Sequence, residues 1–391
     1  MSNLMELFEK LESQNITVHQ NRCVSVRNRN ASCMRCAEAC TSGCISYSDN
    51  TIIIAPEKCV GCGTCATVCP TCALEAHKPG DAQLLQDCLD AMAAADGEAV
   101  IACERILSAA SGLYDPAKVV SVTCLGRVEE SLLVTLAEMG AKRITLVQGE
   151  CDSCELAVGL QTAQLVRDTA NVLLQTWNSP VEVRISAKLP SFIRKTGAEE
   201  FDAGRRGFFT NMKDEATSVA SIVAEESIND ALKIERKEPP KYLKVMEDGT
   251  LPHFIPDRRE RLLDALAALG EPQDVMIDTR LWGHVVIDPE KCTSCQMCAT
   301  FCPTGAIRKW QGEDGTFGVE HYPGDCVKCR CCTDICRTDA LWLSDEVFAV
   351  DLLSGAVDRY EMAPLKNPPS NPHSILHSMK DLIGISQIYE R

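Results

Sequence analysis

The stretches KCTSCQMCATFCPTG (291–305) and DCVKCRCCTDIC (325–336) decide the fold of the C-terminal part of this chain. In both, three cysteines stand three residues apart, and a fourth follows after three further residues. Three thiolates of one tight loop can bind the same iron–sulfur cube, while the fourth serves the cube of the other run. We therefore predict two [4Fe–4S] clusters. Their ligands are Cys292, Cys295, Cys298 and Cys336 for one cluster, and Cys326, Cys329, Cys332 and Cys302 for the other.

This spacing is typical of bacterial ferredoxins, which hold two four-iron clusters. Zinc also binds Cys-x2-Cys pairs, but eight cysteines in this doubled register favour iron–sulfur clusters. Arg337 stands where a proline usually follows the last cysteine. Cys331 falls outside the register, so we interpret it as a thiol that binds no metal.

A second group of cysteines near the N-terminus repeats the pattern less regularly. The run CVGCGTCATVCP (59–70) has the regular spacing. The run before it consists of Cys33, Cys36, Cys40 and Cys44. Two, three and three residues lie between these successive cysteines. In one register these four form a run with one inserted residue. In the other, the first three are the second, third and fourth positions of a run whose first position is Asn30.

We favour the second register, because CTSGCI (40–45) then aligns with CPTGAI (302–307). Asn30 cannot supply a thiolate, so Cys23 is the expected replacement. The predicted ligands are Cys23, Cys33, Cys36 and Cys69 for one cluster, and Cys59, Cys62, Cys65 and Cys40 for the other. If Cys23 is not a ligand, the first site is a three-cysteine [3Fe–4S] or degraded cluster. Cys44 and Cys72 are interpreted as buried thiols.

Between the two groups, apolar segments alternate with amphipathic ones, which predicts parallel strands connected by helices. The predicted strands are 98–102, 118–123, 143–148 and 181–185, and the predicted helices are 105–112, 127–139 and 155–177. No Gly-x-Gly-x-x-Gly follows any of these strands, so a dinucleotide site is not expected. Cys88 lies in a helical segment and is interpreted as a core residue.

Four cysteines of this region follow the ends of predicted strands. They are Cys103, Cys124, Cys151 and Cys154. The carboxyl ends of parallel strands meet at one edge of a sheet, where ligands usually bind, so these thiols are expected to come together. A [2Fe–2S] cluster, a zinc ion and unliganded thiols all remain open for this set.

The segment CLGRVEESLLVTLAEMGAKRITLVQGECDSCELAVG (124–159) resembles the delta subunit of methyl-viologen-reducing hydrogenase, an iron–sulfur protein associated with heterodisulfide reductase. The resemblance rests on the Cys-x-Gly-Arg-Val opening, the Gly-Ala before a strand and the paired cysteines before a glycine. It implies a [2Fe–2S] cluster in this region. Cys103 stands alone where the family has a cysteine pair, and Cys151 and Cys154 are spaced more tightly than in the family.

Composition excludes several classes of function. The formal net charge is −16, so a nucleic-acid partner, which needs a basic face, is not expected. The first residues lack the features of a secretory signal, and no apolar run is long enough to span a membrane. Clustered cysteines then indicate metal sites in a reducing cytoplasm. None of the seven histidines has metal-ligand spacing, and His284 and His321 are expected to be solvated or hydrogen-bonded.

We predict an α/β fold with α+β parts: two dicluster ferredoxin-like modules flank a small parallel-sheet domain of flavodoxin or Rossmann type. The expected regions are an N-terminal 2[4Fe–4S] module at 1–80, the parallel domain at 81–187, a linker with helices at 188–285, a C-terminal 2[4Fe–4S] module at 286–362 and a tail at 363–391. We expect helices at 1–15 and 257–269. The tail is expected to bind a partner or wrap around the protein.

These predictions favour an electron-transfer subunit of an anaerobic oxidoreductase complex. Four [4Fe–4S] clusters and a possible [2Fe–2S] cluster would connect a catalytic subunit to a second redox partner, such as a ferredoxin or a flavoprotein. The catalytic subunit would be a hydrogenase, a formate dehydrogenase, another molybdenum or tungsten enzyme, or a flavin-containing subunit like that of heterodisulfide reductase. Two alternatives stay open: the middle domain is itself a metal reaction site, or the protein is a redox sensor or cluster carrier.

Overall fold

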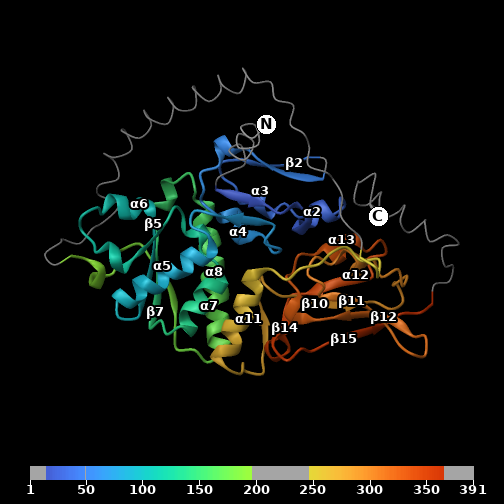
Figure 1. Ribbon diagram of the computed structural model, residues 1–391. Coiled ribbons are helices and arrows are strands. Elements are labelled where there is room, and N and C mark those ends of the chain that lie inside the picture. The colour runs from blue at the N-terminus through green and yellow to red at the C-terminus, as the bar shows by residue number, and fades with distance from the viewer. Residues whose placement is uncertain (1–14, 49, 196–245, 365–391) are drawn as a thin grey trace, which may run out of the picture.

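The computed structural model describes residues 15–48, 50–195 and 246–364. The helix expected near the N-terminus, nearly all of the tail and the centre of the predicted linker lie outside the described residues. Figure 1 shows three regions in contact: the N-terminal module in blue, the middle domain in cyan and green, and the C-terminal module in orange and red. The architecture is mixed α/β, with one parallel sheet and several short antiparallel sheets.

The middle domain is built on a four-stranded sheet in the order β6-β5-β7-β8, in which every pairing is parallel. Its strands are β5 (Glu98–Cys103), β6 (Val120–Val122), β7 (Arg143–Val147) and β8 (Val183–Ser186). Val100 and Ile101 are neighbours on β5 and point to opposite faces, yet both are buried. The sheet is therefore covered on both faces, as the continuous apolar runs predict. The four predicted strands are confirmed, although β6 is shorter than expected.

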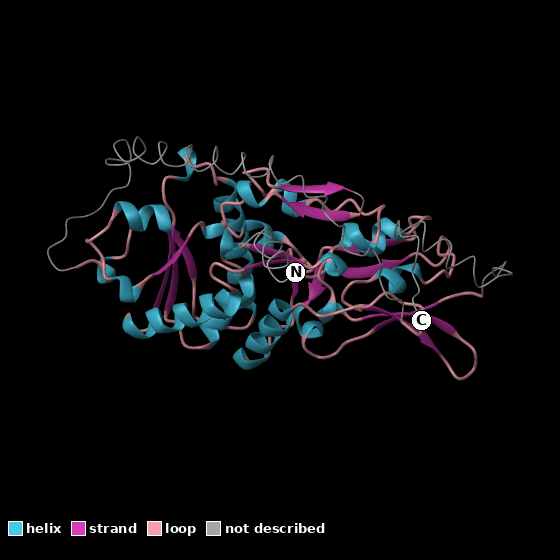
Figure 2. Ribbon diagram, turned by 45° about the horizontal axis from the view of Figure 1, so that its top comes forward, coloured by secondary structure: helices cyan, strands magenta, loops and turns pink. Residues whose placement is uncertain are grey.

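Four helices surround this sheet (Figure 2). They are α5 (Asp81–Ala94), α6 (Glu104–Ala109), α7 (Glu130–Glu138) and α8 (Val158–Thr176). At the start of α7, the carboxylate of Glu129 accepts hydrogen bonds from the backbone N–H groups of Ser131 and Leu132, at 2.7 and 2.9 Å. This N-cap satisfies donors that have no partner inside the helix. No described helix combines the length and apolar character needed to cross a lipid bilayer.

Helix α11 (Asp257–Leu269) covers the outer side of α7, next to it in Figure 1. Leu262 and Leu266 of α11 pack in one buried cluster with Val134 of α7 and with Trp282. The predicted helix at 257–269 is confirmed with the same bounds. Its apolar face is buried within this chain, against the middle domain.

The described residues of the N-terminal module form two antiparallel strand pairs and three short helices. β1 (Ile16–Val18) pairs with β4 (Leu74–Ala76), and β2 (Ile45–Ser48) pairs with β3 (Thr51–Ile54). The helices are α2 (Val24–Arg27), α3 (Arg35–Glu38) and α4 (Thr64–Val68). The main buried cluster of this module has eleven residues, and three of them are cysteines. The module therefore has little apolar core apart from its cysteine sites.

The C-terminal module repeats this topology. β10 (His284–Ile287) pairs with β13 (Leu341–Ser344), and β11 (Ile307–Gln311) pairs with β12 (Phe317–His321). Its helices are α12 (Met297–Phe301) and α13 (Cys331–Ile335), and β15 (Asp358–Glu361) is added beside β12. A further pair joins β9 (Met276–Asp278) to β14 (Glu346–Phe348). In both modules the first strand pairs with the fourth and the second with the third, so the predicted internal repeat is present in the fold.

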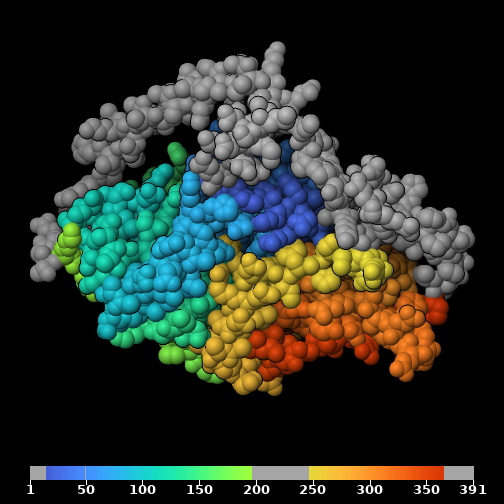
Figure 3. Space-filling view, in the orientation of Figure 1, coloured from blue at the N-terminus to red at the C-terminus, as the bar shows by residue number. Residues whose placement is uncertain are grey.

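Residues 246–270 run along the junction of the three regions, where Figure 3 shows them in yellow. The backbone N–H of Leu251 donates to the carbonyl oxygen of Thr300 in the C-terminal module at 3.0 Å. The guanidinium of Arg258 donates to the carbonyl oxygen of Ala66 in the N-terminal module at 2.9 Å. This segment thus connects both modules to the middle domain.

Candidate metal centres

The three regular cysteine runs share one backbone conformation. Positive φ occurs immediately before and after the second cysteine of each run, at Gly61 and Gly63, Ser294 and Gln296, and Lys328 and Arg330. A short helix then contains the third cysteine and ends at the fourth. Left-handed residues let the chain curl tightly, so the first three thiols can face one point. A cluster that is bound at positions i, i+3 and i+6 needs such a loop.

The irregular run does not form this loop. Met34, which follows Cys33, has a φ of −126°. Cys36 lies in α3, and the residues before Cys33 follow a different path from those of the regular runs. Cys23 lies instead between a 3-10 turn (Gln20–Arg22) and α2.

The residue three positions after the fourth cysteine also has positive φ in every run. These residues are Gly43, Cys72, Gly305 and Asp339. Gly43 makes Cys40 the structural equivalent of the fourth cysteine in the other runs. The residue three positions after Cys44 is Tyr47, which lies in the extended strand β2. This equivalence supports the second register.

One N-terminal set gathers around Cys36. Burial, together with the nearby thiols of Cys69, Cys23 and Cys33, raises the pKa of the Cys36 thiol to about 12. Burial likewise raises the pKa of Cys23 to about 12, with Cys69 and Cys33 as neighbours. The structure therefore brings the four predicted residues of this set together. Removing water from these thiols favours a metal-bound form over a free thiolate.

The other N-terminal set contains five thiols. Burial raises the pKa of Cys65, and its neighbours include Cys62, Cys59 and Cys40. The predicted burial of Cys44 is confirmed. Its sulfur nevertheless lies 3.4 Å from that of Cys40, and it interacts with Cys59. Sequence spacing gave no sign of this crowding, because Cys44 follows Cys40 around a tight turn and returns to the same site.

The C-terminal thiols form two sets with exchanged fourth cysteines. Burial raises the pKa of Cys292, whose thiol neighbours are Cys295 and Cys336. Burial also raises the pKa of Cys332, whose neighbours include Cys329, Cys326 and Cys302. Cys298 interacts with Cys295 and Cys292. The eight thiols are grouped as the doubled register predicts.

Cys331 lies between the two modules. It has no exposed surface, and its thiol donates to the carbonyl oxygen of Phe301 at 3.6 Å. Beside it, the buried guanidinium of Arg27 donates to the carbonyl oxygens of Pro252 at 2.6 Å and Cys302 at 3.4 Å. Arg27 therefore holds the N-terminal module against a predicted ligand of the C-terminal one.

The four middle-domain cysteines meet at the carboxyl edge of the parallel sheet. Cys103 ends β5 and Cys124 follows β6, whereas Cys151 begins a 3-10 turn after β7 and Cys154 follows that turn. Burial raises the pKa of Cys124 to about 12, with Cys62, Cys103 and Cys151 as neighbours. Burial raises the pKa of Cys151 to about 11, with Cys103 and Cys154 as neighbours. The thiols come from three separate loops of the sheet, as their positions predict.

Two glycines allow this edge to pack closely against the N-terminal module. A Cβ on Gly159 would overlap the sulfur of Cys124, and a Cβ on Gly126 would overlap the hydroxyl of Thr64 in α4. Because both positions lack a side chain, Cys124 comes close to Cys62. The glycine after the paired cysteines is part of the sequence resemblance, but nothing in the sequence indicates this packing role.

Two segments of the chain, residues 52–75 and 285–308, match the family model described as a 4Fe-4S binding domain. The chain therefore contains two 4Fe-4S binding domains. The first match contains the run from Cys59 to Cys69, and the second contains the run from Cys292 to Cys302. These domains indicate an iron–sulfur electron-transfer role. No curated protein matches the chain.

The surroundings of the thiols in the 4Fe-4S binding domains suit such clusters. The backbone N–H of Ala73 donates to the sulfur of Cys69 at 3.2 Å, and that of Ser294 donates to the sulfur of Cys292 at 3.5 Å. Hydrogen bonds to cysteine sulfur stabilise the negative charge of a thiolate and influence the reduction potential of its cluster. Cys65 and Cys298 belong to apolar clusters of the two modules, which keep water away from the sulfur atoms.

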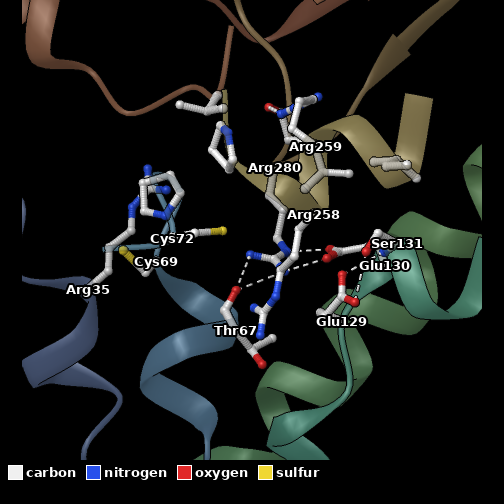
Figure 4. A pocket seen from close by; sticks show the side chains of 15 residues that line it. Arg35, Thr67, Cys69, Cys72, Glu129, Glu130, Ser131, Arg258, Arg259 and Arg280 are labelled. Carbon is white, nitrogen blue, oxygen red and sulfur yellow. Dashed lines mark hydrogen bonds and ion pairs between the residues drawn. The ribbon is translucent and has the colours of Figure 1, made fainter. Parts of the chain in front are cut away.

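An arginine-rich pocket lies where the first 4Fe-4S binding domain meets the rest of the chain (Figure 4). The labelled side chains are those of Arg35, Thr67, Cys69, Cys72, Glu129, Glu130, Ser131, Arg258, Arg259 and Arg280. Arg280 forms an ion pair with Glu130 at 2.6 Å and donates to the carbonyl oxygen of Thr67 at 3.3 Å. The carboxylates of Glu129 and Glu130 thus balance much of the positive charge of the arginines. Through these contacts, the residues that line the pocket connect the N-terminal module to the middle domain.

Asp81, at the start of α5, also connects the regions that meet at this pocket. Its carboxylate forms ion pairs of 2.6 Å with Arg127 and with Arg258. Burial opposes ionisation, but Arg258 and Arg127 hold the pKa of Asp81 well below its usual range. The sequence gives no sign of this network, because the paired residues are 46 and 177 positions apart.

Proposed function

We propose that this chain is the electron-transfer subunit of an anaerobic oxidoreductase complex. It would carry single electrons through four [4Fe–4S] clusters and a [2Fe–2S] cluster in the middle domain. The observation that carries this proposal is the continuous order of the five cysteine sets. A thiol of each set interacts with a thiol of the next, except between the two modules, where Cys331, which belongs to no set, interacts with one thiol on each side.

The order begins in the middle domain, where Cys124 interacts with Cys62. Within the N-terminal module, Cys65 interacts with Cys36. The path then crosses to the C-terminal module near Cys331, which interacts with both Cys23 and Cys302. Finally, Cys332 interacts with Cys298. Because electron tunnelling slows steeply with distance, this succession of neighbouring thiols supports a path through all five sites.

Each end of the order includes thiols that reach the surface. Cys295, in the last set, is exposed, whereas Cys151 and Cys154, in the first, are partly exposed. We place one redox partner at each end. The resemblance of residues 124–159 favours a hydrogenase or a flavin subunit like that of heterodisulfide reductase near the middle domain. A ferredoxin or flavoprotein would then exchange electrons near Cys295.

The test uses the full chain, purified without oxygen together with the proteins that accompany it. The proposal predicts about 18 iron atoms per chain, no zinc bound through sulfur, and an associated oxidoreductase. Stepwise reduction followed by electron paramagnetic resonance should show one [2Fe–2S] signal in addition to those of [4Fe–4S] clusters. The Cys124→Ser variant should lose only the [2Fe–2S] signal, and Cys88→Ser, which changes a core thiol, is the matched control.

Other results would contradict parts of this proposal. About 16 iron atoms with one zinc bound through sulfur would remove the middle domain from the electron path. An isolated monomer that loses its clusters to a chelator and cannot be reduced reversibly would overturn the electron-transfer role. That behaviour would favour a cluster carrier or sensor.

A further inference from the structure

Two histidines and an aspartate meet on the C-terminal module. His284 begins β10, His321 ends β12, and Asp358 begins β15 (Figure 1). His321 and Asp358 are opposite each other in the antiparallel pair β12–β15, whereas His284 belongs to the other sheet of the module. The three side chains thus join two separate sheets.

The distances among these side chains suit a metal ion better than direct hydrogen bonds. Asp358 Oδ2 lies 3.5 Å from Nδ1 of His284 and 3.5 Å from Nδ1 of His321. Good N–H···O bonds are shorter, at about 2.7–3.2 Å. A tetrahedral ion with bonds of about 2.1 Å to nitrogen and oxygen holds its ligands about 3.4 Å apart. One atom from each of the three residues lies within 4.8 Å of the other two.

The orientation of the rings and their exposure also fit such a site. The two imidazole rings are nearly perpendicular, at 80°, with centroids 5.8 Å apart. His321 has no exposed side-chain surface, whereas His284 and Asp358 are 33% and 37% exposed. An ion can therefore reach the site from solvent, and a water molecule can complete its coordination.

A metal at Nδ1 would also explain the other nitrogen of His321. Nε2 is buried and has no hydrogen bond of acceptable geometry, although the thiol of Cys326 interacts with this ring. A neutral imidazole that binds metal through Nδ1 carries its proton on Nε2. That N–H could then donate to the sulfur of Cys326, a predicted cluster ligand.

We propose that His284, His321 and Asp358 bind one divalent transition-metal ion, most suitably Zn²⁺, with water as the fourth ligand. Two imidazoles and a carboxylate are common zinc ligands, and imidazole also suits other transition metals. The ion would link the β10–β13 pair to the β11–β12–β15 sheet. This site uses no cysteine ligand, although His321 lies beside Cys326, and it does not depend on the proposed electron path.

The test adds Zn²⁺ to the full chain after its clusters have been loaded and its iron counted. X-ray absorption at the zinc edge should show nitrogen and oxygen neighbours at about 2.0–2.1 Å and no sulfur at about 2.3 Å. The variants His284→Gln and Asp358→Asn should each weaken zinc binding at least tenfold. They change partly exposed side chains, so the module should still fold, which an unchanged iron content will verify.

The matched control is His19→Gln. His19 forms another histidine–carboxylate pair, at 2.8 Å from Glu75, in the N-terminal module. Its substitution should leave zinc affinity unchanged. Failure to bind zinc, zinc with sulfur neighbours only, or equal affinity in His284→Gln and the unmodified chain would each overturn the proposal. The last two results would assign the three residues to a proton-sharing histidine–aspartate cluster.

Discussion

The N-terminal and C-terminal modules have the same strand pairing but build their cysteine loops differently. In the N-terminal module, the left-handed positions of the regular run are Gly61 and Gly63. In the C-terminal module, all four such positions carry side chains, namely Ser294, Gln296, Lys328 and Arg330. A left-handed conformation costs an L residue about 1–2 kcal/mol. The N-terminal module thus has relaxed loop residues and one irregular run, whereas the C-terminal module has regular runs and a strained backbone.

Side-chain contacts offset part of this strain in the C-terminal module. The amide of Gln296 donates to the carbonyl oxygen of Gly318 at 2.7 Å. The ammonium of Lys328 donates to the carbonyl oxygen of Thr279, also at 2.7 Å. Regular cysteine spacing therefore does not require glycine in the loop, provided that other contacts or a bound cluster hold the backbone.

Removing the iron should have the largest effect, and it should separate the modules from the middle domain. The main buried cluster of each module has eleven residues, including several cysteines, whereas that of the middle domain has 33. Chelation under reducing conditions should therefore unfold both modules and leave the parallel sheet folded. Hydrogen exchange should then show protection in the parallel sheet, including β5 and β7, and none in the strands of the two modules, with loss first in the strained C-terminal module. Persistent protection in β2 and β3 would contradict this.

Loss of one thiol should distinguish the irregular run from the regular ones. Cys23→Ser should remove or convert one N-terminal [4Fe–4S] cluster. Asn30, at the first position of the irregular run, offers no thiolate, so Cys23 is the only predicted source of the fourth ligand. Cys44→Ser is the matched control, since Cys44 is also buried beside a ligand set but is predicted not to bind iron. Iron counting and electron paramagnetic resonance will compare them. If Cys44→Ser loses the cluster and Cys23→Ser keeps it, the first register is right.

The strands of the middle domain could be predicted because their information is local. The apolar stretch 98–102 is buried on both faces, and its end places Cys103 at the sheet edge. The position of Cys23 could be inferred because Asn30 occupies a position that needs a thiol. In both cases a short segment carries the physical requirement.

Contacts between distant segments could not be predicted in this way. Asp81 and Arg258 are 177 residues apart, and nothing near either residue indicates their pairing. His284 and Asp358 likewise meet only because the β10–β13 pair packs against the β11–β12–β15 sheet in the folded module. Cys44 was correctly expected to be buried, but its contact with Cys40 depends on the turn at Gly43. The burial of Cys44 follows from its residue type and position in the sequence pattern. Its contact with Cys40, like the Asp81–Arg258 pair, follows from the path of the folded chain.

Arg27 tests the junction between the two unlike modules. Its guanidinium is buried and donates to four carbonyl oxygens, those of Asn21, Pro252, Phe301 and Cys302. Arg27→Met should destabilise the loaded protein by about 2–4 kcal/mol, because buried acceptors lose their donors. The anaerobic thermal unfolding midpoint will measure the loss. Arg29→Met, which changes a nearby exposed arginine, should have little effect, and an equally small effect of both would contradict the assigned role of Arg27.

Gly63 tests the relaxed loop of the N-terminal module. Its φ is +74°, and an added Cβ would overlap the side chain of Arg127, which holds Asp81. Gly63→Ala should therefore cost about 2–3 kcal/mol, from left-handed strain and displacement of Arg127. Gly43→Ala is the control, since its φ is +63° and nothing lies within 4 Å of the added Cβ. Gly43→Ala should cost only the left-handed backbone strain, about 1 kcal/mol of unfolding free energy. If Gly43→Ala and Gly63→Ala lower the unfolding midpoint equally, Arg127 makes no contribution.

Arg330 tests the strained loop of the C-terminal module, where the reverse substitution should help. Its φ is +66° and its side chain is exposed, so little contact is lost when the side chain is removed. Arg330→Gly should raise stability by up to about 1 kcal/mol, because relief of left-handed strain exceeds the added backbone entropy of the unfolded chain. Gln296→Gly relieves the same strain but loses the hydrogen bond to Gly318, so it should be neutral or destabilising. If both variants lower the unfolding midpoint of the loaded protein equally, left-handed strain does not distinguish the two modules.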